Sequence, residues 1–256
     1  MIRKYLPFWS VLRRELYRFW GIKRQTILGP LLETSLYISV FGAALGQRIQ
    51  SLDGHPYIVF LIPGLLMMSF AMNVFSNNSS SLMQQKIQRS IDDQLTSPIP
   101  NTQLFMAYAT GGIIRASIIA VIILTTAKVL IKDLPIAHPF LMTLTFLLIG
   151  FFFAMLGVLI GLWSEKFDDL SLYQTFVIQP LIFLGGVFYS AELLPAFFAK
   201  VVQFNPIYYM INSVRYTMLG RGNVNLAVSL SLIALAGFVL FLVNRHLFNK
   251  GYKLRT

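Results

Sequence analysis

The fold is decided by residues 170–220, which read LSLYQTFVIQPLIFLGGVFYSAELLPAFFAKVVQFNPIYYMINSVRYTMLG. The first part, residues 170–189, is mostly apolar and holds the roughly 20 residues that one helical membrane crossing needs. Two apolar pieces of about a dozen residues each, 192–204 and 206–219, follow it. Pieces of that length are typical of re-entrant or interfacial helices, which protein or a water-filled cavity must cover at membrane depth. The stretch predicts a polytopic membrane protein with re-entrant helices at residues 190–220.

The composition agrees with this prediction. Hydrophobic residues make up 56% of the 256 residues and charged residues only 12%, about half of the charged fraction of soluble domains. We therefore expect a single transmembrane domain over residues 1–256, with no soluble catalytic domain beside it. The chain has no cysteine, which excludes disulfides and thiolate metal sites. Its three histidines are far apart, so a metal site is not expected.

The apolar runs predict an all-α membrane protein with six transmembrane helices. The expected spans are residues 26–45, 57–75, 104–129, 140–163, 170–189 and 226–243. Of the 21 lysines and arginines, seven precede Thr26, and basic residues beside the first span mark a cytoplasmic side. An even number of spans then places both termini in the cytoplasm. No soluble basic surface remains that would read nucleic acid.

Residues 4–22 precede the first span and have an amphipathic pattern. Apolar and aromatic residues recur at three- and four-residue spacing, and Arg14 and Arg18 are expected on the opposite face. Such a helix lies in the plane of the lipid headgroups. It is either a simple interfacial anchor or a lever that links the membrane domain to a cytoplasmic partner.

The loop at residues 84–98 is the first cytoplasmic segment after the second span. Ile87, Ile91 and Leu95 follow one another every four residues, and Pro98 ends the expected short helix. A single apolar ridge on a polar helix suits docking into a groove of another protein. Alternatively, the ridge packs against the membrane domain of its own chain.

Three charged residues lie in or beside predicted membrane segments. Glu33 is in the first span and Arg115 in the third. Charges inside a membrane are costly and mark a pathway or a pair, so these two either serve a transport path or gate, form an ion pair with each other, or extend to the nearer interface. Glu192 begins the re-entrant region, where its carboxylate either lines an external gate or caps the following short helix.

Spans two and five carry soft and aromatic side chains together with a few polar ones. This set comprises Met67, Phe70 and Asn73 in span two, and Thr175, Phe176, Gln179 and Phe183 in span five. Such side chains suit an amphipathic passenger, but they also suit ordinary packing in a helix bundle. The GxxxG pairs Gly42/Gly46 and Gly157/Gly161 permit close helix approach within one chain or between two.

The missing motifs are also informative. The sequence contains no GxxxxGK[ST] phosphate-binding loop, so the chain does not hydrolyse a nucleotide through a P-loop and is not expected to be an enzyme. Ion-coupled transport needs acidic residues at mid-membrane, and Glu33 alone is available. An ATP-independent secondary transporter or channel is therefore the less favoured alternative.

The chain resembles ABC-2 type transporter permeases, and in particular YadH-like bacterial inner-membrane subunits. The resemblance rests on the amphipathic N-terminal helix, the six spans, the docking loop and the run LGGVFYS at residues 184–190. It also rests on Leu194-Pro195, Phe204-Asn205-Pro206 and the FLIPGL and FDDLSL segments at residues 60–65 and 167–172. It covers essentially the whole chain and is most specific over residues 163–220.

The resemblance implies a homodimer in the bacterial inner membrane, with two copies of a separate ATP-binding subunit. This chain binds no cofactor, and ATP and magnesium belong to the partner subunit. The coupling helix that docks on the ATPase is expected to use Lys86, Ile87, Arg89, Ile91, Asp92 and Leu95. Spans two and five then line the translocation path, and the re-entrant helices, with Glu192, Asn205 and Pro206, form its outer lid. The resemblance also implies that the complex is an exporter, and the aromatic, methionine-containing spans suit an amphipathic or lipid-like substrate.

Overall fold

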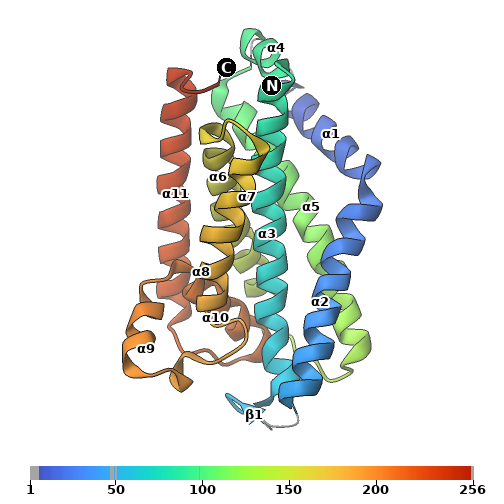
Figure 1. The fold of residues 1–256 in the computed structure, drawn as a ribbon, viewed down its shortest axis with the longest axis vertical. Helices are drawn as coiled ribbons and strands as arrows, with labels where there is room; N and C mark the ends of the chain where they lie inside the picture. The colour runs from blue at the N-terminus through green and yellow to red at the C-terminus, as the bar shows by residue number, and fades with distance from the viewer. Residues whose placement is uncertain (1–5, 47–48, 50, 98, 255–256) are drawn as a thin grey trace.

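The computed structural model describes residues 6–46, 49, 51–97 and 99–254, and shows an elongated helical bundle (Figure 1). Helix α1 (Leu6–Gly21), α4 (Ser90–Thr96) and the C-terminal end of α11 (Leu226–Lys250) lie at one end. The hairpin of β1 (Ser51–Leu52) and β2 (His55–Pro56) lies at the other end.

Long helices run between these ends. They are α2 (Lys23–Gly46), α3 (Tyr57–Ile87), α5 (Asn101–Leu130), α6 (Pro139–Trp163) and α11. A broken helix, made of α7 (Phe167–Tyr173), η2 (Gln174–Ile178) and α8 (Gln179–Leu184), runs in the same direction. Within the described ranges, four helices are long and apolar enough to cross a membrane, namely α3, α5, α6 and α11. The predicted helical membrane class is thus confirmed with these four spans.

Helix α3 is the centre of the bundle. It contacts α2, α5, α6 and α10 (Pro206–Leu219), and its residues Phe60, Met67 and Phe75 have no exposed surface. Its 31 residues correspond to about 46 Å at 1.5 Å per residue, which exceeds the roughly 30 Å hydrocarbon core of a bilayer. Its C-terminal turns therefore reach the end of the bundle at which α1 and α4 lie (Figure 1).

The second GxxxG pair joins α6 to α3 within one chain. A Cβ atom on Gly157 would lie 2.7 Å from the Phe75 carbonyl oxygen, and one on Gly161 would lie 2.7 Å from the Ser79 carbonyl oxygen. These distances are too short for any side chain, so glycine is needed for the two backbones to approach. The intramolecular alternative is the correct one for this pair.

Short helices cover the end of the bundle at which β1 lies (Figure 1). They are the 3₁₀ turn η3 (Ala191–Leu193), α9 (Ala196–Gln203) and α10. Their bounds match the two short pieces expected at residues 192–204 and 206–219. Helix α10 is largely buried and contacts α3, α6 and α11, so protein covers its backbone.

Candidate functional site

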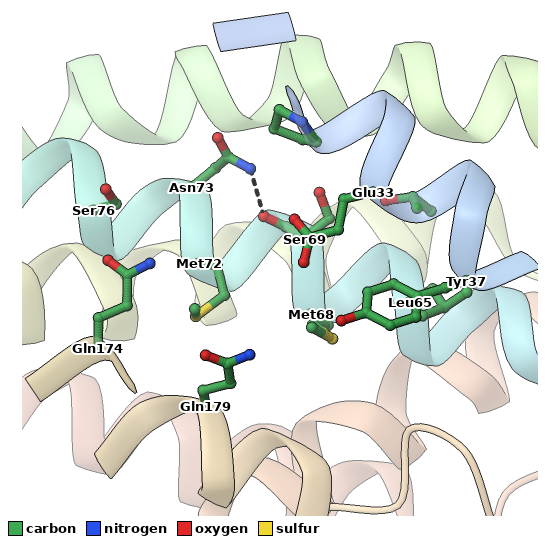
Figure 2. A pocket seen from close by; sticks show the side chains of 12 residues that line it. Glu33, Tyr37, Leu65, Met68, Ser69, Met72, Asn73, Ser76, Gln174 and Gln179 are labelled. Atoms are coloured by element: carbon green, nitrogen blue, oxygen red, sulfur yellow. Dashed lines mark hydrogen bonds between the residues drawn. The ribbon is translucent and has the colours of Figure 1, made fainter. Parts of the chain in front are cut away.

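A polar cavity lies between α2, α3 and the η2–α8 segment (Figure 2). Its volume is about 250 Å³. The residues that line it are Pro30, Glu33, Thr34 and Tyr37 from α2, Leu65, Met68, Ser69, Met72, Asn73 and Ser76 from α3, Gln174 from η2 and Gln179 from α8. Hydroxyl, amide and carboxyl groups thus face one space between helices that are otherwise apolar.

One face of α3 supplies half of this lining. Ser69, Asn73 and Ser76 follow one another at four- and three-residue spacing, which places them on the same side of a helix. The Asn73 Nδ2 atom donates a 2.8 Å hydrogen bond to the Ser69 carbonyl oxygen. The Ser69 Oγ atom is buried and has no hydrogen-bond partner. This polar stripe could be read from the sequence, although our prediction included only Asn73 from it.

A π-helical segment brings two glutamines to the cavity. In an α-helix of 3.6 residues per turn, residues five apart point about 140° away from each other. In η2 the backbone amide of Gln179 donates a hydrogen bond to the backbone carbonyl of Gln174, five residues earlier. A π-turn of this kind brings residues five apart to nearly the same face of the helix. Pro180 follows directly and has no amide hydrogen. Figure 2 shows both glutamine side chains directed into the cavity.

Among the described residues that line the cavity, Glu33 alone carries a charged side chain. The predicted ion pair between Glu33 and Arg115 is wrong, because the structure has no such contact. Arg115 instead donates a 2.6 Å hydrogen bond to Asn77 Oδ1 and a 3.3 Å bond to Thr26 Oγ1. The two Nη atoms of Arg115 thus bind neutral groups nearer the α1 end of the bundle, while its Nε is buried without a hydrogen-bond partner.

Only some of the predicted path residues face this cavity. Asn73 and Gln179 line it, whereas Met67 is fully buried and the ring of Phe70 packs edge-on against Phe146 at 4.9 Å. The cavity lies beside both of the helices named in that prediction, but apart from Asn73 the α3 residues that line it are others than the predicted ones.

The predicted span-five residues divide in the same way. Thr175 and Phe176 are exposed, and Phe176 keeps 72% of its surface accessible. The ring of Phe183 lies 5.7 Å from that of Phe188. Phe188 in turn lies 5.7 Å from Tyr37 and 4.6 Å from Phe41, so Phe183 belongs to an aromatic cluster that adjoins the cavity through Tyr37.

Helix α1 packs against the bundle with only part of the apolar face predicted from the sequence, which comprised Tyr5, Phe8, Trp9, Leu12, Leu16, Phe19 and Trp20. Its buried residues are Val11, Leu12, Glu15 and Phe19. Trp9 and Trp20, which we assigned to the apolar face, are 61% and 63% exposed. Tyr5, also assigned there, lies outside the described residues.

The basic side of α1 turns inward toward the carboxylate of Glu15. Arg18 Nη2 lies 3.1 Å from Glu15 Oε2, and Ser81 Oγ on α3 donates a 2.6 Å bond to the same oxygen. Arg14 and Arg18 are therefore not opposite the buried face, because the buried acid draws them in.

A chain of hydrogen bonds joins α1 to α4. Arg14 donates a 2.9 Å bond to the hydroxyl of Tyr108 on α5, and this hydroxyl donates a 2.6 Å bond to Gln94 Oε1 on α4. Gln94 Nε2 then donates a 3.0 Å bond to Gln85 Oε1 on α3. Tyr108 is fully buried. Four helices at this end are thus held by one polar network.

Lys86 is not available for docking, contrary to our prediction. It is 2% exposed, and its Nζ donates to the carbonyl oxygens of Leu162 at 2.8 Å and Ser164 at 2.7 Å. These carbonyls belong to the end of α6 and the residue after it, where helix carbonyls have no partner within the helix. Lys86 therefore caps α6 with its ammonium group.

The other predicted docking residues separate into buried and exposed ones. Ile91 is 1% exposed and Leu95 packs against the core, so the apolar ridge faces its own chain, as the alternative interpretation proposed. Ile87 is 53% exposed, and Arg89 is exposed in the left-handed backbone conformation that separates α3 from α4. Asp92 is partly buried. The surface that remains for a partner includes Ile87 and Arg89.

Ordered polar contacts hold the opposite end of the bundle. Asn205 caps α10 by accepting a 3.0 Å bond from the Ile207 amide, and it donates a 2.6 Å bond to the Leu181 carbonyl of α8. Pro206 is the first residue of α10. Arg215, which our prediction did not single out, is 3% exposed, and it donates to the Gly186 carbonyl at 3.0 Å. Glu192 is exposed in η3.

Comparisons with known proteins cover nearly the whole chain. The family model described as ABC-2 type transporter matches residues 7–219. The chain is 34% identical to the inner membrane transport permease YadH of Escherichia coli (strain K12), over 96% of each chain. It is 26% identical to Nodulation protein J of Rhizobium leguminosarum bv. viciae, over 94% of each chain, and 25% identical to Nodulation protein J of Rhizobium meliloti (strain 1021), over 94% of this chain and 93% of that one.

Proposed function

The chain belongs to the ABC-2 type transporter family, as the sequence resemblance indicated, and on that premise we propose that it is the permease subunit of an ATP-driven exporter. Two copies of the chain would form the membrane part, and two copies of a separate ATP-binding subunit would supply the energy. The apolar helices and the inner-membrane permease among its relatives support a multi-pass inner-membrane protein.

We propose six membrane crossings, which adds α2 and the broken helix α7–η2–α8 to the four apolar spans. Helix α2 has 24 residues, or about 36 Å, which suffices to cross a bilayer. Both elements run parallel to the four spans (Figure 1). The basic residues before Thr26 then place α1, α4 and the end of α11 at the cytoplasmic side.

The polar cavity between α2, α3 and η2–α8 is the observation that carries the proposal. Groups such as Glu33, Asn73 and Gln179 are costly inside a bilayer unless they serve a path or a partner. They converge here from three separate elements. In a homodimer, a second copy facing α2 and η2 would close the open side of the cavity and join two such cavities into one path for an amphipathic substrate.

The polar network at the α1 end supports a mechanical role for this end. Because α1, α3, α4 and α5 share hydrogen bonds through Tyr108 and Gln94, a force applied to the exposed surface at Ile87 and Arg89 reaches α3 directly. Helix α3 also forms one wall of the cavity. ATP-driven closure of the partner subunits would thus shift the cavity between two states, provided that the partner binds these states with different affinity.

The short helices at the other end form the proposed outer lid. The contact from Asn205 to the Leu181 carbonyl ties α10 to α8, which continues the segment that lines the cavity. Glu192 lies exposed in η3 before α9. A shift of α8 would therefore be passed to α9 and α10.

Co-purification tests the proposed ATPase partnership. The tagged chain, expressed in its own host, should retain an ATP-binding subunit on an affinity column. Ile87→Asp should reduce the retained ATPase by about tenfold or more, since a charge then replaces an exposed apolar contact. The matched control is Leu193→Asp, on the similarly exposed Leu193 at the opposite end, which should retain the ATPase.

A transport assay separates this proposal from the alternative of an ATP-independent transporter. Glu33 is the observation that favours the alternative, since a lone acid in a cavity suits ion coupling. Transport by the isolated chain in vesicles, without the ATPase and against a gradient, would establish the alternative. Transport that requires both proteins and ATP would establish the exporter.

A further inference from the structure

The carboxylate of Glu33 lies in the cavity without a cationic partner. Within the described chain, no nitrogen of lysine, arginine or histidine lies within 4.0 Å of it. Lysine, arginine and histidine are also absent from the cavity lining. Arg115, which the sequence suggested as an ion-pair partner of Glu33, donates hydrogen bonds to Asn77 and Thr26 instead.

The position of Glu33 along α2 makes this lone charge significant. It lies seven residues after Thr26, where the expected first span begins, which corresponds to about 10 Å along the axis. That distance is roughly a third of the hydrocarbon core of a bilayer. An ionised carboxylate at such a depth is retained where a positive group reaches it.

The rest of the lining indicates what kind of positive group fits. Ser69 Oγ is a buried hydroxyl without a hydrogen-bond partner, and Gln174 and Gln179 direct their amides into the same space (Figure 2). The cavity of about 250 Å³ is several times the roughly 30 Å³ that one water takes up in the liquid. It therefore has room for a substituted headgroup and is too large for one bare ion.

An apolar surface continues from the polar part of the cavity. Tyr37 lines the cavity and its ring lies 6.1 Å from Phe41 and 5.7 Å from Phe188. Aromatic faces attract organic cations as well as alkyl groups. Met68 and Met72 on α3 add adaptable apolar contacts. The site thus pairs one anionic group with an aromatic and methionine-rich wall.

We propose that this cavity binds an amphiphile with a cationic ammonium headgroup. Glu33 binds the ammonium group, Ser69 and the two glutamines bind polar groups beside it, and the alkyl part lies along Tyr37 and the aromatic rings that adjoin it. This assignment rests on the proposed function in one respect, because it identifies the bound amphiphile with the transported substrate.

A pair of matched probes tests the proposal. Dodecylamine is cationic at neutral pH, whereas N-dodecylacetamide has the same alkyl chain and no charge. The experiment measures the equilibrium binding of each probe to the full-length chain in nanodiscs made of neutral lipid. The wild-type chain should bind the amine about tenfold or more tightly, as expected for a hydrogen bond to a charged group. Equal affinities for the two probes would overturn the proposal.

Two variants locate the preference. Glu33→Gln should reduce the preference for the amine to less than about twofold, while Asp133→Asn, which removes an exposed acid outside the cavity, should keep the wild-type preference. An unchanged preference in Glu33→Gln would refute the assignment to this residue. The wild-type comparison needs no variant, so it decides the matter even if Glu33→Gln does not fold.

Inorganic cations are the other source of positive charge. Saturable displacement of dodecylamine by K⁺ or Mg²⁺ at constant ionic strength would assign the site to a bare ion and contradict the proposal. The test is independent of the ATPase experiment. If the amine preference is absent and the ATPase complex forms, only the proposed substrate class is refuted. If the complex does not form and the amine preference is present, only the proposed exporter function is refuted.

Discussion

Arg18 on α1 and Arg115 on α5 donate hydrogen bonds to the same atom, Asn77 Oδ1, at 3.2 Å and 2.6 Å. Asn77 belongs to α3 and is 5% exposed, so a single amide oxygen joins three helices. Two positive groups meet there because the oxygen is neutral but strongly polar, and because Glu15 lies 3.1 Å from Arg18. This junction explains why Arg115 does not need Glu33.

Replacing Asn77 should test this junction. Asn77→Leu removes the shared acceptor and leaves two guanidinium groups with fewer partners, which should cost roughly 3 kcal/mol of stability. Asn77→Asp should retain most of the stability because it still accepts both bonds. Thermal unfolding in detergent measures the effect, and equal stability of Asn77→Leu and the wild type would contradict the account.

Lys86 should be essential for the end of α6. Lys86→Met keeps the length of the side chain but removes the ammonium that bonds to the carbonyls of Leu162 and Ser164. We expect a loss of about 2 to 4 kcal/mol in the same unfolding assay. Arg89→Asn is the control, since Arg89 is exposed and asparagine accepts its left-handed backbone conformation. A similar loss in both variants would argue against a capping role for Lys86.

Ile91 and Ile87 should behave differently although they are one helical turn apart in sequence. Ile91→Asp places a charge in a site that is 1% exposed, so it should reduce the stability and the yield of the chain itself. Ile87→Asp should leave the melting temperature within about 2 °C of the wild type, since exposed substitutions change stability little. If Ile91→Asp folds normally and abolishes only ATPase binding, then α4 docks through its ridge after all.

Cysteine labelling should map the cavity wall, and the chain has no cysteine of its own. Single cysteines at Ser76 or Asn73 should react with a small water-soluble maleimide, since both positions line the cavity. Cysteines at Met67 or Phe70 should react at least tenfold more slowly, as those side chains are buried in the bundle. Faster labelling at Met67 or Phe70 than at Ser76 or Asn73 would show that α3 faces the cavity with the side that carries Met67 and Phe70.

The Lys253–Glu165 ion pair at the α1 end of the bundle should depend on pH in a defined way. Their atoms lie 2.9 Å apart. The Lys253 hydrogen bond lowers the pKa of Glu165 below its ordinary 4.5, and the same bond raises the pKa of Lys253 above its ordinary 10.5. The stabilising effect is therefore lost as pH falls through the lowered pKa of Glu165 or rises through the raised pKa of Lys253.

Limited proteolysis of the C-terminal segment measures this pair. Cleavage after Lys253 should be slow at neutral pH and become faster only once the pH falls through the lowered pKa of Glu165. Glu165→Gln should show the fast cleavage at neutral pH. A cleavage rate that is the same for Glu165→Gln and the wild type would mean that the ion pair does not hold the segment.

Sequence patterns predicted the elements better than their contacts. The apolar runs located α3, α5, α6 and α11, and the Asn205-Pro206 pair located the start of α10, because local propensities and apolar length decide these features. The π-turn at Gln174 was not predicted, since an i→i+5 hydrogen bond has no distinct sequence pattern; only Pro180 hinted at a break. Gln179 was among the predicted path residues, but its partner in the cavity, Gln174, was missed for this reason.

The errors at α1 and α4 have a common physical cause. Periodicity indicates which residues share a face, but not which face a buried polar group will turn inward. Glu15 on α1 binds Arg18 and Ser81. The free energy gained from these contacts exceeds the cost of leaving Trp9 and Trp20 exposed. Ile91 likewise packs against its own chain, because an apolar ridge does not distinguish between its own core and a partner.

The central claim is that an ATP-binding partner drives changes in the cavity between α2, α3 and α8. Its most direct test is the maleimide labelling rate of the Asn73→Cys chain in inside-out vesicles that contain the ATP-binding subunit. We predict that ATP changes this rate at least threefold, and that the change disappears when the subunit is absent or unable to hydrolyse ATP. A rate that is the same with and without ATP, or that changes without the subunit, would contradict the account.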